Sequence, residues 1–568
     1  MLRQVNQVMV SSGVPMGASS DQTIAIIDSG VDISHPEFSN RVVAGACFST
    51  ASGTFVVGGG ALPSLCSTTS NGSPSKGSPC SSSNSLFNDA LRNCGHGTHV
   101  AGIAASSSTT DAILSGLAPS AKIVSVQTKS LANNPDFATE PLIPYISEHK
   151  DIDIVDALNW VHTNAIENNR KLAAVNMSFG YVPKPSESWD LGICQAHIPG
   201  LLPAVFPLTN IGVAVVASAG NLRPNAPSYG LSTPACESGI IAVGATNKQS
   251  QAMPYSNFGF PERLADFVAP GGANIATGFQ TTPNPCTDST DSNTPICASK
   301  RGGSRELRSG TSMSAPAVAG AISRVRHRFP SITGMQAAAL LKASGQPVNS
   351  LWVSANIVQP NLESAFRQAT LPQGIMASTA TCGQINLSWA APSILQANEY
   401  RVRYASTAAG LEAAAQTVTF QAATSFSIAA TQQQFYQVIA KDVTGDGVWS
   451  SVGSATPNAC APNAVNNARE YGAPANPNCI KGIQWDANAG HTGDYEVEEI
   501  CDNNGGGVQT GTARVMGLNL LPFATPACAN NGAWAGSVHT FRVRACQALV
   551  CSGWSAAIIG GVVDRCSQ

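Results

Sequence analysis

The stretch Ile24-Ala-Ile-Ile-Asp28-Ser-Gly30 places an aspartate directly after a short, continuous apolar run. A strand that is apolar on both faces and ends at turn residues is typical of the buried interior of a parallel sheet. The first 370 residues contain four further runs of this kind: Ile123–Val126, Leu172–Met177, Val213–Ala217 and Ile240–Val243. Between them, Asp151–Asn168 repeats apolar residues at helical spacing. The alternation predicts an α/β domain over residues 1–370, with a parallel sheet and helices on both faces.

Two stretches interrupt this alternation, and both are poor in apolar periodicity. Residues 44–93 are crowded with Ser, Gly and Pro and, with Cys94 at their edge, contain four cysteines. We interpret them as a long surface insertion held by disulfides, for example Cys66 with Cys80. Residues 279–303 form a second candidate insertion, in which Cys286 and Cys297 would close a short loop.

After residue 371 the sequence changes to short alternating strands with turn signals, which predicts an all-β region. A weak internal repeat divides it into residues 371–459 and 460–568. Each copy has an early tryptophan, a central tyrosine strand and a late strand before Trp-Ser, at Trp389, Tyr400 and Trp449 in the first and Trp485, Tyr495 and Trp554 in the second. Cys382 and Cys460 bracket the first copy, and the second is rich in cysteine. The pattern resembles tandem fibronectin type III domains, which implies two β-sandwiches.

The composition excludes several classes of protein. Only 11% of the 568 residues are charged and the net charge is −3, which argues against a nucleic-acid partner. No apolar run reaches 18 residues, so no membrane span is expected. The sixteen cysteines divide evenly around residue 372 without zinc-site spacing, which indicates disulfides made in an oxidising compartment. We therefore expect a secreted, extracellular or periplasmic protein. Met1–Val10 lacks an apolar signal core, so we expect the signal peptide and pro-region to be absent from this chain.

Three short segments carry residues suited to acyl transfer. Asp28 ends the first predicted strand, Gly95-His96-Gly-Thr-His99 opens a helical stretch, and Gly310-Thr-Ser312 precedes another helix. Each segment alone is commonly a turn, a packing site or a helix cap. Active sites of open α/β sheets form at the carboxyl ends of strands and adjacent helix starts, where all three segments fall. Together they supply a nucleophilic hydroxyl, an imidazole base and an orienting carboxylate.

The same segments resemble the motifs of the subtilisin family of serine proteases, the subtilases. Ile-Asp28-Ser-Gly, His96-Gly-Thr-His-Val-Ala-Gly and Gly-Thr-Ser312-Met-Ser-Ala-Pro occur in the Asp, His, Ser order known for subtilisin itself. Ser314 departs from the alanine of many members. The resemblance covers roughly residues 20–368 and implies Asp28, His96 and Ser312 as catalytic residues, with His99 a packed structural histidine.

Two further segments match this family. Val215-Val-Ala-Ser-Ala-Gly220-Asn221 corresponds to the strand that supplies the side chain of the oxyanion hole, which implies that role for Asn221. Asn176-Met-Ser178-Phe-Gly180 resembles the segment that pairs with an extended substrate backbone. The resemblance implies four substrate-binding residues: Ser178, Gly180, Ser218 and Gly220.

The function implied by this resemblance is that of a secreted serine endopeptidase acting on proteins or peptides through an acyl-enzyme intermediate. Its C-terminal modules would bind polymeric substrate or a cell surface. Two alternatives stay open: a processing protease of narrow specificity, and a catalytically inactive subtilase-like adhesion or binding protein. No cofactor is required and no metal ligand is assigned. The resemblance leaves open a structural calcium, since Glu37 lies near a position that is acidic in some members.

Overall fold

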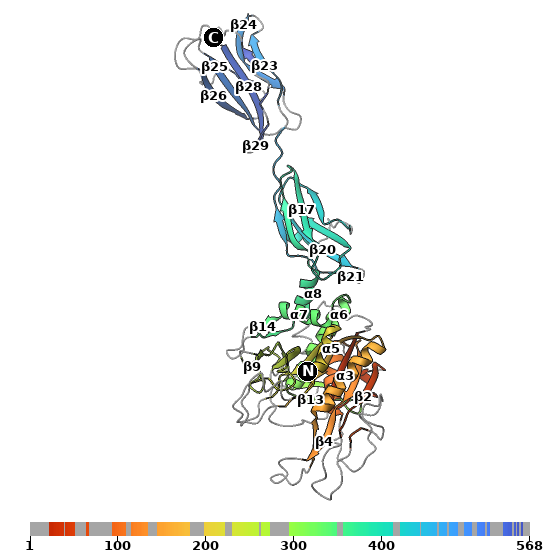
Figure 1. The fold of residues 1–568 in the computed structure, drawn as a ribbon. Coiled ribbons are helices and arrows are strands. Elements are labelled where there is room, and N and C mark those ends of the chain that lie inside the picture. The colour runs from red at the N-terminus through yellow and green to blue at the C-terminus, as the bar shows by residue number, and fades with distance from the viewer. Residues whose placement is uncertain are drawn as a thin grey trace. The chain divides into compact units, whose positions relative to one another are not determined.

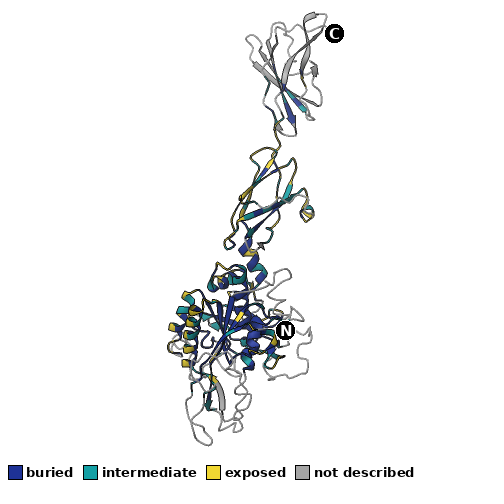
Figure 2. Cartoon of the chain, turned by 90° about the vertical axis from the view of Figure 1, so that its right-hand side faces the viewer, coloured by how far each residue is buried: buried dark blue, intermediate teal, exposed yellow. Residues whose placement is uncertain are grey.

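The apolar runs form a nine-stranded sheet in the computed structural model of the chain, in the order β14-β15-β11-β8-β7-β6-β1-β3-β2 (Figure 1). β1 (Gln22–Asp28) lies between β3 (Lys122–Gln127) and β6 (Lys171–Met177) and is parallel to both. All seven residues of β1 are buried, as the dark blue strands of Figure 2 show. The predicted parallel α/β domain is confirmed.

The structure describes a defined set of residues, and the statements below concern these alone. They are 22–38, 40–50, 64–66, 94–108, 115–133, 145–181, 198–221, 230–260, 263–272, 295–348, 356–412, 421–442, 445–462, 465–473, 476–486, 494–502, 508–516, 520–522, 538–547, 550–552, 554–555 and 558–560.

The other strands of the sheet continue this arrangement on both sides of β1. They are β2 (Val42–Cys47), β7 (Ala214–Ser218), β8 (Ile240–Thr246), β11 (Phe267–Pro270), β14 (Gln346–Pro347) and β15 (Val358–Gln359). All neighbours pair in parallel except β14 with β15, which are antiparallel. Parallel strands bring their carboxyl ends to one edge, so the residues that follow β1, β6 and β7 meet there.

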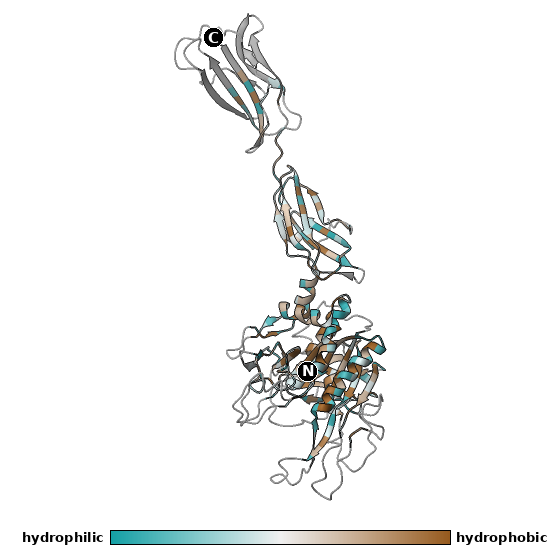
Figure 3. Cartoon of the chain, viewed as in Figure 1, coloured by the Kyte–Doolittle hydropathy of each residue, from teal (hydrophilic) through white to brown (hydrophobic). Residues whose placement is uncertain are grey.

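Helices cover both faces of this sheet. On one face α3 (Asp151–Glu167) and α5 (Leu201–Asn210) share a core with Ile27 and the inward residues of the neighbouring strands. On the other, α2 (Gly95–Ala105) contacts β1, and α6 (Thr311–Arg328) contacts β1, β6, β7 and β8. The brown colouring of the central strands in Figure 3 marks this apolar interior. α7 (Gly334–Ser344) and α8 (Leu362–Thr370) are further helices among the residues that the structure describes here.

The first predicted insertion, residues 44–93, begins inside the sheet. β2 runs to Cys47, which forms a disulfide with Cys66 at a Cα–Cα distance of 5.7 Å. The backbone N–H of Leu65 donates to Ser49 Oγ at 2.8 Å, which brings the two cysteines together. The expected pairing of Cys66 with Cys80 is therefore wrong, because the strand places Cys47 within reach of Cys66.

The end of the second predicted insertion, residues 279–303, belongs to a hairpin. β12 (Ile296–Lys300) pairs antiparallel with β13 (Ser304–Arg308). Cys286 lies outside the described residues, so its pairing with Cys297 stays a prediction. Two further hairpins are β4 (Lys129–Asn133) with β5 (Tyr145–His149), and β9 (Gly259–Phe260) with β10 (Arg263–Leu264).

The C-terminal region consists of two sets of sheets. In the first, β16 (Gln373–Ser378), β17 (Gln384–Ala390) and β19 (Ser425–Ala429) form one sheet, and β18 (Glu399–Ala405), β20 (Gln434–Asp442), β21 (Gly445–Asp446) and β22 (Gly453–Ala455) form the other. In the second, β23 (Asn466–Ala473), β24 (Asn476–Asp486) and β27 (Leu520–Pro522) form one sheet. Its other sheet holds β25 (Asp494–Asp502), β26 (Val508–Met516), β28 (Val538–Gln547), β29 (Val550–Cys551) and β30 (Ile558–Gly560).

The two copies of the sequence repeat make equivalent aromatic contacts. The ring centroids of Trp389 and Tyr400 are 5.6 Å apart, and those of Trp485 and Tyr495 are 5.2 Å apart. Trp485 is fully buried in a core that draws residues from both sheets of the second set. The early tryptophan thus occupies the same place in each copy.

The Trp-Ser pair near the end of each copy also has one structural role. Ser450 accepts the N–H of Val438 on its hydroxyl at 3.1 Å, and Ser555 accepts that of Val543 at 2.9 Å. The preceding tryptophans lie under arginines: Arg403 is 4.4 Å from the Trp449 ring centroid and Arg544 is 4.3 Å from that of Trp554. These cation–π contacts hold each turn against the neighbouring strands.

By its contacts the chain divides into two compact units. The first contains Met1–Leu371 with the segments Pro392–Ala397 and Lys441–Val448, and the second contains Pro372–Ala391, Asn398–Ala440 and Trp449–Gln568. Cys382 forms a disulfide with Cys460, and Cys546 with Cys551. None of the helices in the described ranges is both long enough and apolar enough to cross a membrane.

Candidate active site

Asp28 is the last residue of β1 and lies at the carboxyl edge of the sheet, fully buried. The N–H of Ser29 donates a hydrogen bond to Asp28 Oδ1 at 2.6 Å. Because β1 lies between β3 and β6, the carboxylate stands near the middle of the edge where the strands end.

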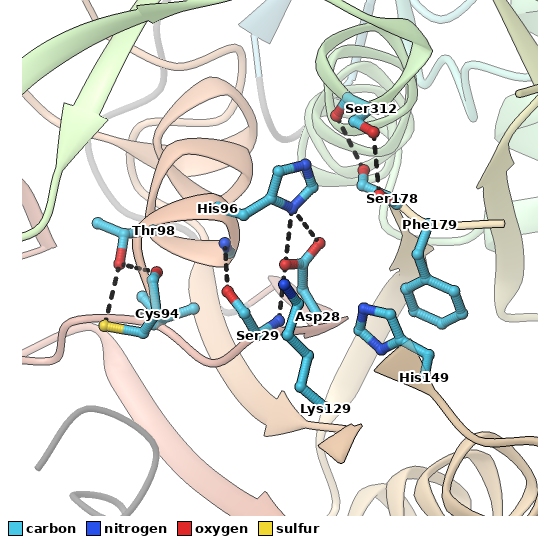
Figure 4. Close-up of polar contacts among 12 residues, drawn as sticks. Asp28, Ser29, Cys94, His96, Thr98, Lys129, His149, Ser178, Phe179 and Ser312 are labelled. Carbon is cyan, nitrogen blue, oxygen red and sulfur yellow. Dashed lines mark hydrogen bonds and ion pairs between the residues drawn. The ribbon is translucent and has the colours of Figure 1, made fainter. Parts of the chain in front are cut away.

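His96 lies in the first turn of α2 and faces this carboxylate (Figure 4). Its Nδ1 is 2.8 Å from Asp28 Oδ1 and 3.0 Å from Oδ2. Gly97 sets the approach of the helix: its N–H donates to Ser29 Oγ at 3.0 Å, and a Cβ there would lie 2.2 Å from the Gly30 carbonyl oxygen. Only glycine lets the helix start this close to the strand end.

The electrostatics of Asp28 follow from this contact. Burial raises the pKa of the carboxyl, but the charge and hydrogen bond of His96 outweigh it and lower the pKa to about 2. Asp28 is therefore ionised throughout the neutral range and can stabilise an imidazolium at His96.

Ser312 is the second residue of α6, and its side chain exchanges hydrogen bonds with Ser178. Ser312 Oγ donates to the Ser178 carbonyl at 3.0 Å, and Ser178 Oγ donates to the Ser312 carbonyl at 2.9 Å (Figure 4). The hydroxyl thus does not make the hydrogen bond to His96 that the triad pattern leads us to expect, because its rotamer points to the end of β6. Hydrogen bonds of this kind commonly tighten only when substrate binds.

The side-chain amide of Asn221 has its orientation fixed by Thr311. Both the N–H and the hydroxyl of Thr311 donate to Asn221 Oδ1 at 3.0 Å, while the hydroxyl accepts the N–H of Gly220 at 3.2 Å. The amide oxygen is thereby occupied and the N–H₂ faces away from Thr311. Sequence reasoning missed Thr311, although its place beside Ser312 in Gly-Thr-Ser was the available signal.

Of the four predicted substrate-binding residues, Ser178 and Gly180 follow β6, Ser218 is the last residue of β7, and Gly220 follows it; the two strands are neighbours in the sheet. Ser218 Oγ donates to the Phe179 carbonyl at 3.4 Å, so the two segments also contact each other directly. A Cβ at Gly180 or Gly220 would meet Ser232 Oγ at 2.4 or 2.8 Å. Ser232 therefore closes the space beside both glycines, a role that no local sequence signal indicates.

His99 lies one turn after His96 but faces the interior. Its Nε2 is 3.1 Å from the Ile296 carbonyl oxygen and 3.2 Å from that of Glu306, both on the β12–β13 hairpin. Burial lowers the pKa of His99 well below its usual value, so its ring is neutral. The residue packs the hairpin against α2 and takes no part in the constellation around Asp28.

Glu37, the residue considered for calcium, has its carboxylate occupied by this chain. Its Oε1 accepts hydrogen bonds from the Nε and Nη2 of Arg305, the first at 2.7 Å, and its Oε2 accepts the Ser299 hydroxyl at 2.5 Å. Calcium is bound by six to eight oxygens, and a guanidinium at the same carboxylate repels a divalent cation. The residues described around Glu37 therefore do not fit a calcium site.

The chain is similar in sequence to known proteins. A family model described as the subtilase family matches residues 19–369. The thermophilic serine proteinase of Bacillus sp. (strain AK1) is 29% identical over 266 residues, which cover 46% of each chain. Subtilisin Savinase of Lederbergia lenta is 28% identical over 256 residues, 45% of this chain and 72% of the relative. The chain spans about half the length of several curated relatives that it matches.

The structure of sphericase is 20% identical with a TM-score of 0.39, and the match covers 60% of this chain and 89% of that one.

The low pKa of Asp28 predicts how stability depends on pH. Because the folded-state pKa of about 2 lies below the ordinary 3.8, the ionised carboxylate stabilises the fold above about pH 4 and loses this contribution as the pH falls to about 2. In a Ser312→Ala background, which prevents self-digestion, Asp28→Asn should remove about 2 kcal/mol of this pH-dependent stability. Denaturant unfolding at a series of pH values measures the difference, with the exposed Glu167→Gln as the control for loss of one carboxylate. A difference that stays constant from about pH 5 to about pH 2 would contradict the prediction.

Proposed function

The chain belongs to the subtilase family, and we propose that it is a serine endopeptidase that hydrolyses peptide bonds through an acyl-enzyme intermediate. The observation that carries the proposal is the contact of His96 Nδ1 with Asp28, 2.8 Å, at the sheet edge where α6 also presents Ser312. A buried carboxylate that orients an imidazole beside a hydroxyl at a helix start is the arrangement that acyl transfer requires.

The proposed reaction begins with a rotation of the Ser312 hydroxyl from the Ser178 carbonyl towards His96 Nε2. The oxygen attacks the substrate carbonyl while His96 takes its proton, and Asp28 stabilises the imidazolium. The oxyanion accepts hydrogen bonds from Ser312 N–H and the Asn221 amide, which Thr311 has already oriented. His96 then gives the proton to the leaving amine, and water hydrolyses the acyl ester by the reverse sequence. The proposed steps use side chains and a backbone N–H of this chain, together with the substrate and water.

The substrate is proposed to be a protein or peptide in extended conformation. Backbone groups at Ser178 and Gly180 would pair with it as an added strand, and the segment from Ser218 to Gly220 would line the opposite side. The contact of these two segments through Ser218 and the Phe179 carbonyl supports one continuous binding surface.

Two alternative functions differ from this proposal in what they require. An inactive adhesion or binding protein would tolerate loss of a triad residue, whereas Asp28, His96 and Ser312 are all present and Asp28 with His96 are in contact. A processing protease of narrow specificity would use the same chemistry. A peptide-library cleavage profile, with Ser312→Ala as its control, separates broad from narrow specificity.

We propose further that the two C-terminal sets of sheets are fibronectin type III-like modules that bind polymeric substrate or a cell surface. The equivalent positions of Trp389 and Trp485, and the three-stranded sheet with Trp in each copy, support two modules of one kind. Disulfides at Cys47–Cys66, Cys382–Cys460 and Cys546–Cys551 support a secreted protein.

The nucleophile is tested by covalent labelling. A fluorophosphonate probe should modify Ser312 in the wild-type chain, and Ser312→Ala should abolish the label. Ser314→Ala is the matched control, because the Ser314 hydroxyl is buried and donates to the Ala269 carbonyl at 2.9 Å, away from His96. Peptide mapping by mass spectrometry identifies the labelled residue, and a label on another serine of the folded chain would overturn the assignment.

The oxyanion hole is tested at Asn221. Removal of the equivalent donor in subtilisin itself lowers kcat by about 10²–10³-fold, and we expect a loss of that order for Asn221→Ala with little change in KM. Steady-state hydrolysis of a peptide anilide measures both constants. Asn159→Ala, an exposed amide on α3, is the control. A loss of less than about threefold would exclude the proposed role.

The role of the second module is tested by truncation. Because Pro392–Ala397 and Lys441–Val448 belong to the first unit, the truncation should remove only residues 463–568 and keep Cys460. We expect unchanged kcat/KM on a soluble peptide and slower release of fragments from an insoluble protein, measured by amine release. Equal rates on the insoluble protein would show that this module does not dock substrate.

A further inference from the structure

The hairpin of β4 and β5 leaves the sheet directly after β3, at the edge that holds Asp28. Lys129 and His149 are cross-strand partners at its base, and Figure 4 shows both side chains on the side of Asp28. Residues 134–144, between the strands, lie outside the described residues. The base of the hairpin therefore places two side chains beside the proposed triad.

Hydrogen bonds of Thr128 fix this base to the triad strand. The N–H of Thr128 donates to the Asp28 carbonyl at 3.0 Å. The hydroxyl of Thr128 is hydrogen-bonded to His149 Nδ1 at 2.8 Å. The position of the His149 ring is thus tied through one residue to the backbone of Asp28.

The ring of His149 also packs against the ring of Phe179. The two rings are stacked, with centroids 4.0 Å apart and an interplanar angle of 13°. Phe179 stands between Ser178 and Gly180, the segment proposed to pair with substrate, and Ser178 in turn exchanges two hydrogen bonds with Ser312. One continuous set of contacts therefore runs from Asp28 through Thr128, His149 and Phe179 to the nucleophile.

The charges around His149 keep its ring neutral. Burial lowers the pKa of His149 to about 3; Asp28 opposes this shift, and electrostatic interactions with Lys129 and His96 add to it. At neutral pH the stack with Phe179 is between two uncharged rings. The ring adds no second cation beside Asp28, so its effect on the site is through packing.

We propose that His149 is a positioning residue: its ring, held by Thr128, fixes Phe179 and thereby the backbone of Ser178–Gly180 in the conformation that an extended substrate pairs with. The proposal rests on the proposed peptidase function. It assigns to the β4–β5 hairpin a part in binding extended peptides. A substrate with a single residue does not pair with Ser178–Gly180, so its hydrolysis would not depend on the hairpin.

The experiment compares an extended peptide anilide with a single-residue ester for four variants. His149→Ala and His149→Leu remove the aromatic ring, and His149→Phe replaces it with another aromatic ring. Thr128→Val removes the hydrogen bond between Thr128 and His149. An aromatic pair of this kind corresponds to about a three- to tenfold effect, so His149→Ala and His149→Leu should lower kcat/KM for the peptide by that factor relative to the ester, mainly through KM. His149→Phe keeps an aromatic ring but, like Thr128→Val, loses the hydrogen bond to Thr128, so both variants should give a ratio between those of His149→Ala and the wild-type chain.

Concentrations of active sites are set by fluorophosphonate titration, so an unfolded fraction does not enter the ratio. His162→Ala, in the second half of α3, is the control for loss of a histidine. A peptide-to-ester ratio unchanged in both His149→Ala and His149→Leu overturns the proposal, as does a ratio for His149→Phe that is no higher than that for His149→Ala. Absence of Ser312 labelling in the wild-type chain would instead refute the peptidase function on which it rests.

Discussion

The burial of an ionised Asp28 at the end of β1 is the constraint on which the rest of the site depends. A buried carboxylate is strongly destabilising unless hydrogen bonds and an opposite charge compensate it. Here hydrogen bonds from the Ser29 N–H and His96 Nδ1 compensate it, which requires α2 to begin within contact of the strand end. That approach in turn requires Gly97, whose missing side chain makes room for the Gly30 carbonyl. The geometry of the proposed triad is thus a condition of burying this charge.

The parts of the fold that could be predicted are those encoded by local pattern. Continuous apolar runs ending at polar turns identify buried parallel strands, and Asp28, His96 and Ser312 stand where such strands end or helices begin. Thr311 was indicated only by its place beside Ser312, whereas Ser232 and His149 could not be predicted, because their contacts depend on which segments lie opposite them in space. Ser232 meets two glycines that precede it by 52 and 12 positions, a relation that only the pairing of β6 with β7 creates. Likewise, cysteine spacing could not distinguish Cys47 from Cys80 as the partner of Cys66.

The C-terminal repeat shows a different relation of sequence to structure. Its two copies share few residues, yet the shared ones are those that contact each other: the early tryptophan with the central tyrosine, and the serine after the late tryptophan with the adjacent strand. Between these positions the strands are free to vary, because an antiparallel sheet needs only alternation and register. A handful of aromatic and hydroxyl side chains is therefore enough to make the repeat recognisable.

The pairing of Glu37 with Arg305 determines how the contacts of this carboxylate depend on the composition of the medium. A bound metal ion is lost on dilution or to a competing chelator, because its occupancy depends on the concentration of free ion. The guanidinium of Arg305 is tethered to the polypeptide, so its effective concentration at Glu37 is set by the β12–β13 hairpin and not by the medium. The cation at this carboxylate is therefore part of the polypeptide, and the contact depends on the hairpin staying folded.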